Sequence, residues 1–200
     1  MQLVLDDALL DRMVRAVEAV KIRLKRAASA LEAGGVPYAV VGGNAVAAHV
    51  ASADESSVRN TRDVDILIRR ADFPAARAAL EAAGFIYRHA ASIDMFLDGK
   101  GTKAGDAIHI LYAAEKVRSD SVAASPDVSE VVTPTIGHTA GHAVANLPAL
   151  VTMKLTSYRD KDRTHLRDMI SVGLIDATWP AKFPPPLGDR LQAVLDDPDG

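Results

Sequence analysis

Two aspartates separated by a single residue give the clearest chemical signal in the sequence. Residues 61–68 read Thr-Arg-Asp-Val-Asp-Ile-Leu-Ile, and the alternation of a strand places Asp63 and Asp65 on one face and apolar residues on the core face. Neighbouring carboxylates repel each other unless a cation lies between them, and Mg²⁺ prefers paired oxygen ligands. The alternative is an edge strand with a solvated acidic face. Because Asp is depleted from strands, the pattern favours a metal site.

A glycine pair precedes these aspartates by about twenty residues. The apolar run 38–41 ends at Gly42-Gly43, and residues 44–50 are rich in helix formers. Glycines between a strand and a helix let backbone amides approach an anion at the positive end of the helix. By itself the pair is more typical of a plain tight turn, and its spacing matches neither a dinucleotide fingerprint nor a P-loop.

Periodicity predicts the elements that must position these residues. We expect strands at 38–41, 63–68, 85–89, 92–97 and 107–112, helices at 7–32, 44–50, 69–83 and 187–195, and two helices from 147 that meet near Asp160. Residues 121–145 read as a loop with one or two edge strands, and 179–186 as an irregular connector. The fold class is α+β, with a small mixed β-sheet flanked by helices, a long N-terminal helix and C-terminal helices.

These elements are expected to form one compact unit with three portions. Residues 1–36 form a helix packed on the core, 37–145 the α/β core and 146–200 the C-terminal helical portion. The apolar stripe of the first helix either packs on the protein's own sheet or forms a seam with a partner helix, because its spacing is also heptad-like. Its other faces carry basic residues that are either solvated or meet RNA phosphates: Arg12, Arg15, Lys21, Arg23, Lys25 and Arg26.

The combination of the glycine turn with Asp-x-Asp resembles the nucleotidyltransferase superfamily. Its core is a strand, a Gly-Gly or Gly-Ser turn, a helix, and a strand bearing Asp-x-Asp that is introduced by Thr-x-Asp. The sequence is most similar to compact bacterial members related to AbiEii-type toxins and to aminoglycoside nucleotidyltransferases. The resemblance is close over residues 38–68 and looser up to Asp168.

The resemblance implies transfer of a nucleoside monophosphate from an NTP to a hydroxyl of tRNA, a protein or a small molecule. Asp63 and Asp65 would be catalytic and would hold Mg²⁺ or Mn²⁺. Nucleotide binding is assigned to five residues: Gly42, Gly43, Asn44, Arg62 and Lys154. Lys154 interrupts the apolar stripe of a C-terminal helix, where a polyphosphate would supply its anionic partner. The charges at 159–168 are expected to form mostly surface ion pairs.

One position departs from the family pattern. Relatives carry a third carboxylate on a later strand, where this chain has His109. The histidine is assigned as a third catalytic residue, acting as a base or as a ligand for a softer ion such as Mn²⁺. An ordinary half-buried histidine is the alternative, and Asp106 would point to the other face of the strand. His138 and His142 read as loop histidines rather than as a zinc site.

Other functions remain open from the sequence. Loss of the third acid would suit a catalytically impaired nucleotide-binding module, such as half of a toxin–antitoxin pair, and Asp-x-Asp also occurs in metal-dependent glycosyltransferases. The chain has 200 residues, no cysteine and a net charge of -3, which favours a reducing compartment and gives no general attraction to nucleic acid. With no leader or membrane-spanning segment, a cytoplasmic location is expected, with a second copy or an antitoxin as protein partner.

Overall fold

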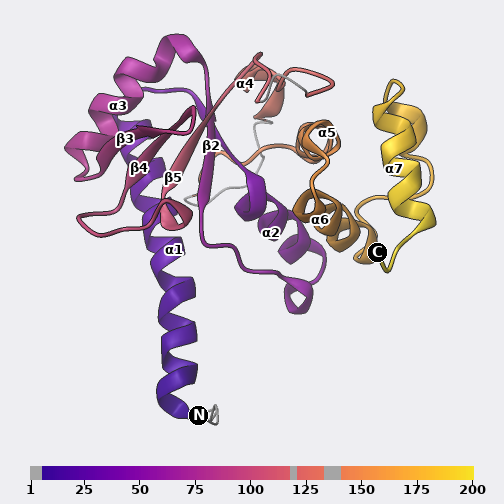
Figure 1. Ribbon diagram of the computed structural model, residues 1–200, viewed down its shortest axis with the longest axis horizontal. Coiled ribbons are helices and arrows are strands. Elements are labelled where there is room, and N and C mark those ends of the chain that lie inside the picture. The colour runs from indigo at the N-terminus through magenta and orange to yellow at the C-terminus, as the bar shows by residue number, and fades with distance from the viewer. Residues whose placement is uncertain (1–5, 118–120, 133–140) are drawn as a thin grey trace.

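The protein folds around one mixed β-sheet, which the computed structural model describes over residues 6–117, 121–132 and 141–200. This part of the chain forms five strands in the order β1-β2-β5-β4-β3, with helices on both faces (Figure 1). The pair β2 and β5 is parallel, and the other neighbours are antiparallel. The predicted α+β class, with its long N-terminal helix and its C-terminal helices, is confirmed.

All five strands form where hydrophobic alternation predicts them. Their bounds are β1 Tyr38–Val41, β2 Val64–Ile68, β3 Ile86–Ala90, β4 Ile93–Leu97 and β5 Ile108–Tyr112. In β2, Val64, Ile66 and Ile68 face one layer of helices and are fully buried. Because side chains alternate, Asp65 faces the other layer. The sheet register sets it opposite Val41 of β1 and His109 of β5.

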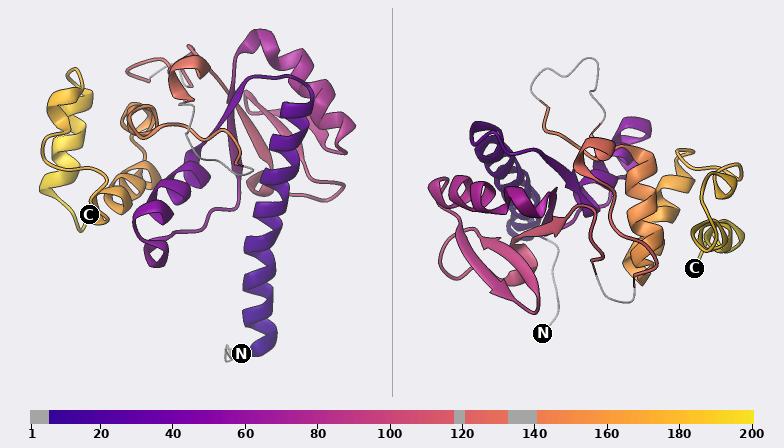
Figure 2. Two further views of the ribbon diagram at one scale, coloured as in Figure 1. Left: turned by 180° about the vertical axis from the view of Figure 1, so that it is seen from behind. Right: turned by 90° about the horizontal axis from the view of Figure 1, so that it is seen from above.

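Two helices cover the face on which Val64, Ile66 and Ile68 lie. They are α1 Asp7–Ala33 and α3 Phe73–Ala82. Leu31 of α1 and Leu80 of α3 are completely buried against this face. Figure 2 shows both helices on one side of the sheet and the C-terminal helices on the other.

On the opposite side of the sheet lie α2 Gly42–Ala53, α5 Leu147–Ser157 and α6 Asp160–Ser171. Helix α7 Leu187–Asp196 packs on α5 and α6 and lies farther from the sheet. Leu67 of β2, Leu150 of α5 and Leu166 of α6 belong to the buried cluster on this side. Asp65 therefore lies on the face where α2 and the C-terminal helices meet the sheet. Across the described residues, no helix is long and apolar enough to cross a membrane.

The segment predicted as loop with edge strands contains a short helix that the sequence analysis missed. Helix α4, Val128–Val131, begins at a capping box formed by Asp127 and Glu130, and Val128 and Val131 are buried. Among the described residues of this segment, edge pairing consists of single bridges from Val144 to Val40 and from Ala145 to Val132. One helical turn is too short to give a periodic signal, so only its cap could have indicated it.

Helix α1 packs on the sheet only by its C-terminal part. Ala27, Ala28 and Leu31 are fully buried, whereas the residues from Met13 to Ala19 are all exposed. Arg23, expected on a solvated or RNA-facing surface, is buried instead. It donates a hydrogen bond to the backbone oxygen of Arg62 and lies 3.6 Å from Asp98. A basic residue on this helix thus anchors it to the loop that precedes β2.

Strand β2 should carry much of the stability, because Ile66 is completely buried between the sheet and α1. We expect Ile66→Ala to lower the free energy of unfolding by about 2–5 kcal/mol through lost burial and a residual cavity. Ile22 is 53% exposed on α1, so the matched change Ile22→Ala should alter stability by less than ~0.5 kcal/mol. Urea unfolding of both variants checks this, and equal effects would contradict the packing described.

Candidate active site

Asp63, Asp65 and His109 come together where β2 and β5 run side by side. The Nδ1 atom of His109 lies 3.4 Å from Oδ1 of Asp65 and 3.9 Å from Oδ2 of Asp63. The three residues offer ligand atoms that all lie within 4.8 Å of one another. Two carboxylate oxygens and one imidazole nitrogen form a donor set suited to Mn²⁺ or to Mg²⁺. The structure therefore brings the three predicted catalytic residues into one cluster that can hold a divalent ion.

The hydrogen bonding of His109 decides which of its nitrogens faces the acids. Its Nε2 atom lies 2.9 Å from the backbone oxygen of Ala104. A carbonyl oxygen can only accept, so Nε2 carries the proton and donates it. In the neutral ring, Nδ1 then directs its lone pair at two carboxylates, which is unfavourable without a cation. Accordingly, the pKa of His109 is raised, chiefly because the Asp65 carboxylate stabilises the imidazolium, although burial opposes this.

The environment of Asp63 keeps its carboxylate ionised. Burial works against the charge, but a hydrogen bond from the Thr61 hydroxyl and the positive charge of Lys161 outweigh it, so the pKa of Asp63 is lowered. The Thr61 hydroxyl donates to Oδ1 of Asp63 over 2.5 Å. Asn44 donates through Nδ2 to the backbone oxygen of Asp63 over 2.8 Å. The Asn44 side chain thus fixes the position of the acidic strand, which sequence reasoning did not foresee.

The glycine pair is required by the close approach of the acidic strand. Gly42 has a positive φ of 68°, a conformation in which side chains are strained. A Cβ atom at Gly42 would overlap with the Asp65 carboxylate, and one at Gly43 would lie 2.9 Å from Cβ of Thr61. The first contact joins the glycine turn to Asp65, and the second joins it to Thr61, whose hydroxyl donates to Asp63.

The first turn of α2 presents an anion-binding end beside the acids. This helix begins at Gly42, and its N-cap residue, Val41, provides no side-chain hydrogen bond. The first backbone N–H groups of a helix lack partners within the helix, and the positive end of its dipole lies there. Because Gly42 touches Asp65, a phosphate bound at these amides would lie next to a metal held by the acids.

Lys154 of α5 reaches the same place but already has an anionic partner. It lines a small cavity together with Gly42 and Asp65. Its Nζ atom donates to Oδ1 of Asp162 over 3.1 Å, and both side chains are buried. Burial lowers the pKa of Lys154, and the Asp162 carboxylate opposes that shift. The negative charge that the sequence analysis expected a polyphosphate to supply to Lys154 is therefore supplied by Asp162 of the protein itself.

Asp162 is the site-adjacent residue that sequence reasoning missed. It was expected to form a surface ion pair, yet its exposed fraction is 0%. Despite burial, its pKa is lowered by the charged hydrogen bonds of Arg159 and Lys154 and by the Ser157 hydroxyl. The sequence signal for it is its place in the first turn of the helix that begins at Asp160, where acidic side chains interact favourably with the positive end of the helix dipole.

A larger cavity, of about 370 Å³, opens from the acids towards β3 and β4. Its wall contains Asp94, 8% exposed, whose carboxylate accepts hydrogen bonds from the hydroxyls of Tyr87 and Tyr112. Arg70 forms a bidentate pair with Glu115 and stacks on the Tyr112 ring. These groups pair with one another, which leaves Lys161, near Asp63, as a cation facing the cavity.

Arg62 is the one predicted site residue that the structure does not bring to the others. Its guanidinium pairs with Asp106 at 2.8 Å, and its side chain is 72% exposed. Its neighbour Asp63 points into the cluster, so the alternation of the chain directs Arg62 elsewhere.

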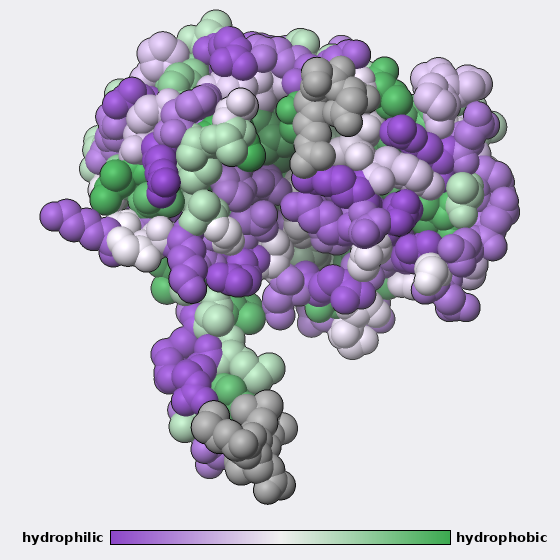
Figure 3. Space-filling model, in the orientation of Figure 1, coloured by the Kyte–Doolittle hydropathy of each residue, from purple (hydrophilic) through white to green (hydrophobic). Residues whose placement is uncertain are grey.

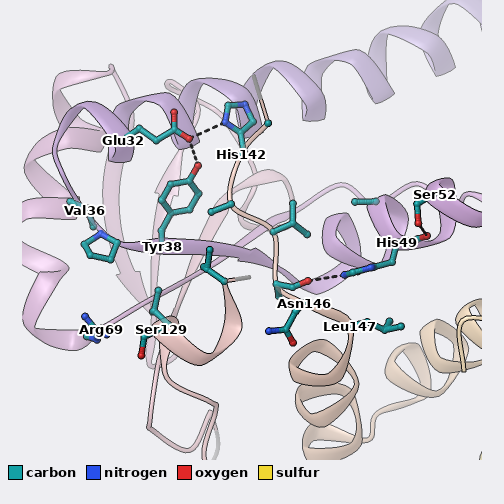
Figure 4. Close-up of a pocket in the computed structure, with 18 residues that line it drawn as sticks. Glu32, Val36, Tyr38, His49, Ser52, Arg69, Ser129, His142, Asn146 and Leu147 are labelled. Atoms are coloured by element: carbon teal, nitrogen blue, oxygen red, sulfur yellow. Dashed lines mark hydrogen bonds and ion pairs between the residues drawn. The ribbon is translucent and has the colours of Figure 1, made fainter. Parts of the chain in front are cut away.

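A separate cavity of about 830 Å³ lies along the outer edge of β1 (Figure 4). Glu32 accepts hydrogen bonds there from the Tyr38 hydroxyl over 2.5 Å and from the His142 Nδ1 over 3.3 Å. His142 thus pairs with a carboxylate from α1, and His138 lies outside the described residues. Of the residues assigned to catalysis or nucleotide binding, none lines this cavity within the described part of the chain.

Comparison with known protein families identifies the chain. Residues 6–123 match a family model described as "Uncharacterised nucleotidyltransferase". The chain belongs to this nucleotidyltransferase family. The match includes the glycine turn, Asp63, Asp65 and His109, and it confirms the resemblance drawn from the sequence. A search of curated proteins gives no significant match.

Solved structures show that this nucleotidyltransferase shares its fold with an antibiotic-resistance enzyme. The crystal structure of ANT(2")-Ia in complex with adenylyl-2"-tobramycin matches with a TM-score of 0.53 at 13% identity, covering 90% of this chain and 97% of that chain. The solution structure of ANT(2'')-Ia matches with a TM-score of 0.50 at 12% identity, covering 93% and 92%. A nucleotidyltransferase-like protein from Paracoccidioides brasiliensis gives 0.49 at 17% identity, covering 91% and 88%.

Substitution at the glycine turn should disturb the acids directly. In Gly42→Ala, a methyl group would overlap with the Asp65 carboxylate at a positive φ, so we expect Mn²⁺ affinity to fall by at least about tenfold. Mn²⁺ titration followed by electron paramagnetic resonance measures this. The control is Gly35→Ala, which also has a positive φ but no atom within 4 Å of the added Cβ. Equal affinities in the two variants would contradict the contact between Gly42 and Asp65.

Stability should fall in acid through His165 of α6. Burial and the nearby charge of Lys154 lower the pKa of His165 to about 4, and its buried Nδ1 has no hydrogen-bond partner among the described residues. Because its folded pKa is depressed, the unfolded chain binds the proton first as pH falls through ~6.5. We expect the free energy of unfolding to decline between about pH 6.5 and 4. His165→Gln should flatten that part of the profile in urea unfolding; an unchanged slope would exclude His165 as its source.

Proposed function

We propose that the protein transfers a nucleoside monophosphate from an NTP to a hydroxyl acceptor, with a divalent metal held by Asp63 and Asp65. The observation that carries the proposal is the cluster of Asp63, Asp65 and His109 within 4.8 Å, placed against the first turn of α2. Membership of the nucleotidyltransferase family supports it. A metal in this cluster would offset the repulsion between the acids and would neutralise charge on the triphosphate.

The triphosphate would lie over the start of α2. Backbone amides of Gly43 and Asn44 can donate to phosphate oxygens, since no capping side chain occupies them. Lys154 adds positive charge in the small cavity that it lines together with Gly42 and Asp65, and Asp162 holds it in place. We propose that this buried pair orients the lysine, so that Lys154 keeps a fixed distance from the phosphates. Arg62 would contribute only if it left Asp106.

In the transfer step, the acceptor oxygen attacks the α-phosphorus and pyrophosphate leaves. The proton of the acceptor hydroxyl needs a base, and His109 is placed for that role or for ligation. Its Nε2 is held by Ala104, so only Nδ1 is available. As a base, Nδ1 would take the proton while Asp65 stabilises the resulting imidazolium.

The acceptor would enter through the 370 Å³ cavity, which adjoins the acids on the side away from α2. A complex of ANT(2")-Ia, which shares the fold, holds adenylyl-2"-tobramycin, so a small hydroxyl-rich acceptor is one class to test. A tRNA or a protein hydroxyl are the others, and Lys161 and Lys116 at the cavity would favour an acceptor that carries negative charge. Reaction in the cytoplasm with Mg²⁺ is part of the proposal.

The second candidate is a nucleotide-binding module with impaired catalysis. It is favoured by one observation, the histidine at the position where relatives carry the third acid. In that case the protein binds Mg²⁺-NTP without turnover and acts through a partner, such as an antitoxin. His109→Asp separates the two candidates. In an impaired module, restoring the carboxylate would raise a low transfer rate, whereas in an enzyme that depends on the histidine it would not raise the rate.

Transfer should depend on both aspartates. With each α-labelled NTP and Mg²⁺ or Mn²⁺, we expect label on RNA, on protein or on an aminoglycoside, and a loss of about 10³-fold in Asp63→Asn or Asp65→Asn. Asp106→Asn is the matched control, because Asp106 pairs with Arg62 outside the cluster. Label transfer that survives in Asp63→Asn would refute the assignment. Binding of Mg²⁺-NTP without transfer would select the second candidate.

A further inference from the structure

The first half of α1 extends from the rest of the protein with an apolar stripe in solvent (Figure 3). Leu10, Met13 and Val17 on this stripe are 44%, 56% and 44% exposed, and Val14 beside them is 68% exposed. The exposed stretch runs to Ala19, about 20 Å along the helix axis. In Figure 1 this part of α1 lies below the sheet and away from the other helices.

An apolar helix face that is exposed to water does not stabilise its helix. A helix of this length is marginal without packing, because its stability comes mostly from burial of an apolar face. Here only the part from Arg23 onward is buried on the sheet. We therefore expect the exposed part of α1, up to Ala19, to pack against a second apolar surface.

The spacing of the stripe indicates what that surface is. Successive apolar residues alternate steps of three and four, as a and d positions of a heptad do: Leu10, Met13, Val17, Val20, Leu24, Ala27 and Leu31. The later members pack against the body of the protein, whereas the first three are exposed. A strict seven-residue period matches a helix that twists around a partner helix.

We infer that two copies of the chain associate through an antiparallel pair of α1 helices. Antiparallel pairing places the two bodies at opposite ends of the seam, so the exposed part of each helix covers that of the other. With Met13 of one helix packed against Val17 of the second copy, the exposed parts of the two stripes cover each other. Leu10 then lies at the end of the seam, beside Val20, which is partly buried on its own body. A parallel pair would instead bring both bodies to the same end of the seam, where α1 is already covered.

Charge complementarity supports this register. Asp7, Val14 and Lys21 occupy equivalent e positions beside the stripe, and e positions face one another in antiparallel pairs. In this register Asp7 of each copy lies opposite Lys21 of the other, and Val14 lies opposite itself near the twofold axis. Among the residues that the structure describes, Lys21 pairs with Glu18 at 3.6 Å, and both side chains are exposed, so this pair contributes little to stability.

The interface is small, since it covers about three turns of each helix. It falls below the standard size of ~1,600 Å² for stable complexes. The dimer should therefore be reversible, and its population should rise with protein concentration. Sedimentation equilibrium of the full chain, over about a hundredfold range of concentration, measures this.

Substitution within the stripe tests the surface. We expect Met13→Glu with Val17→Glu to weaken dimerisation by at least about a hundredfold, since it places four charges in the seam. The matched control is Ile22→Glu. Ile22 is exposed to a similar degree on the same helix but lies outside the seam, so its dimer should match the wild type. Circular dichroism of each variant checks that the body remains folded.

Charge reversal tests the orientation. Asp7→Lys alone and Lys21→Asp alone should each weaken the dimer, and the double variant should restore it. A wild-type chain that stays monomeric at every concentration would overturn the proposal. So would a dimer that survives Met13→Glu with Val17→Glu, or one that both single reversals and the double reversal leave unchanged.

Discussion

The arrangement of the site depends on the contact between a glycine without a side chain and the carboxylate of Asp65. Gly42 leaves no room for a Cβ atom beside Asp65, so the turn that opens α2 lies directly on the acidic strand. That contact places the positive end of a helix next to two carboxylates and an imidazole that could hold a divalent ion. Phosphate and metal can then be bound side by side, which is the requirement for nucleotidyl transfer.

The C-terminal helices add a second constraint, the buried pair of Lys154 and Asp162. Two buried charges are costly unless they are paired and hydrogen-bonded, and Asp162 satisfies this condition through Lys154, Arg159 and Ser157. The pair joins α5 to the start of α6 and holds Lys154 at the cavity that Gly42 and Asp65 share. The helices beyond the glycine and aspartate motifs thus complete the site.

Local patterns predicted the strands and the glycine and aspartate motifs, because alternation and turn chemistry are properties of short segments. The role of Asp162 could not be predicted in this way. It lies among Arg159, Asp160 and Lys161, a charged run typical of a solvated surface, and only the packing of α5 on α6 buries it. Arg62 was assigned to nucleotide binding, but its guanidinium pairs with Asp106, away from the acids.

The central claim is that Asp63 and Asp65, with His109 beside them, hold a divalent ion next to the first turn of α2. The most direct measurement is a crystal structure with Mn²⁺ and a non-hydrolysable NTP analogue, with the ion located by its anomalous scattering. The account predicts Mn²⁺ bound by the carboxylates of Asp63 and Asp65, with the phosphates at the amides of Gly43 and Asn44. Mn²⁺ bound elsewhere, or nucleotide phosphates away from the start of α2, would contradict it.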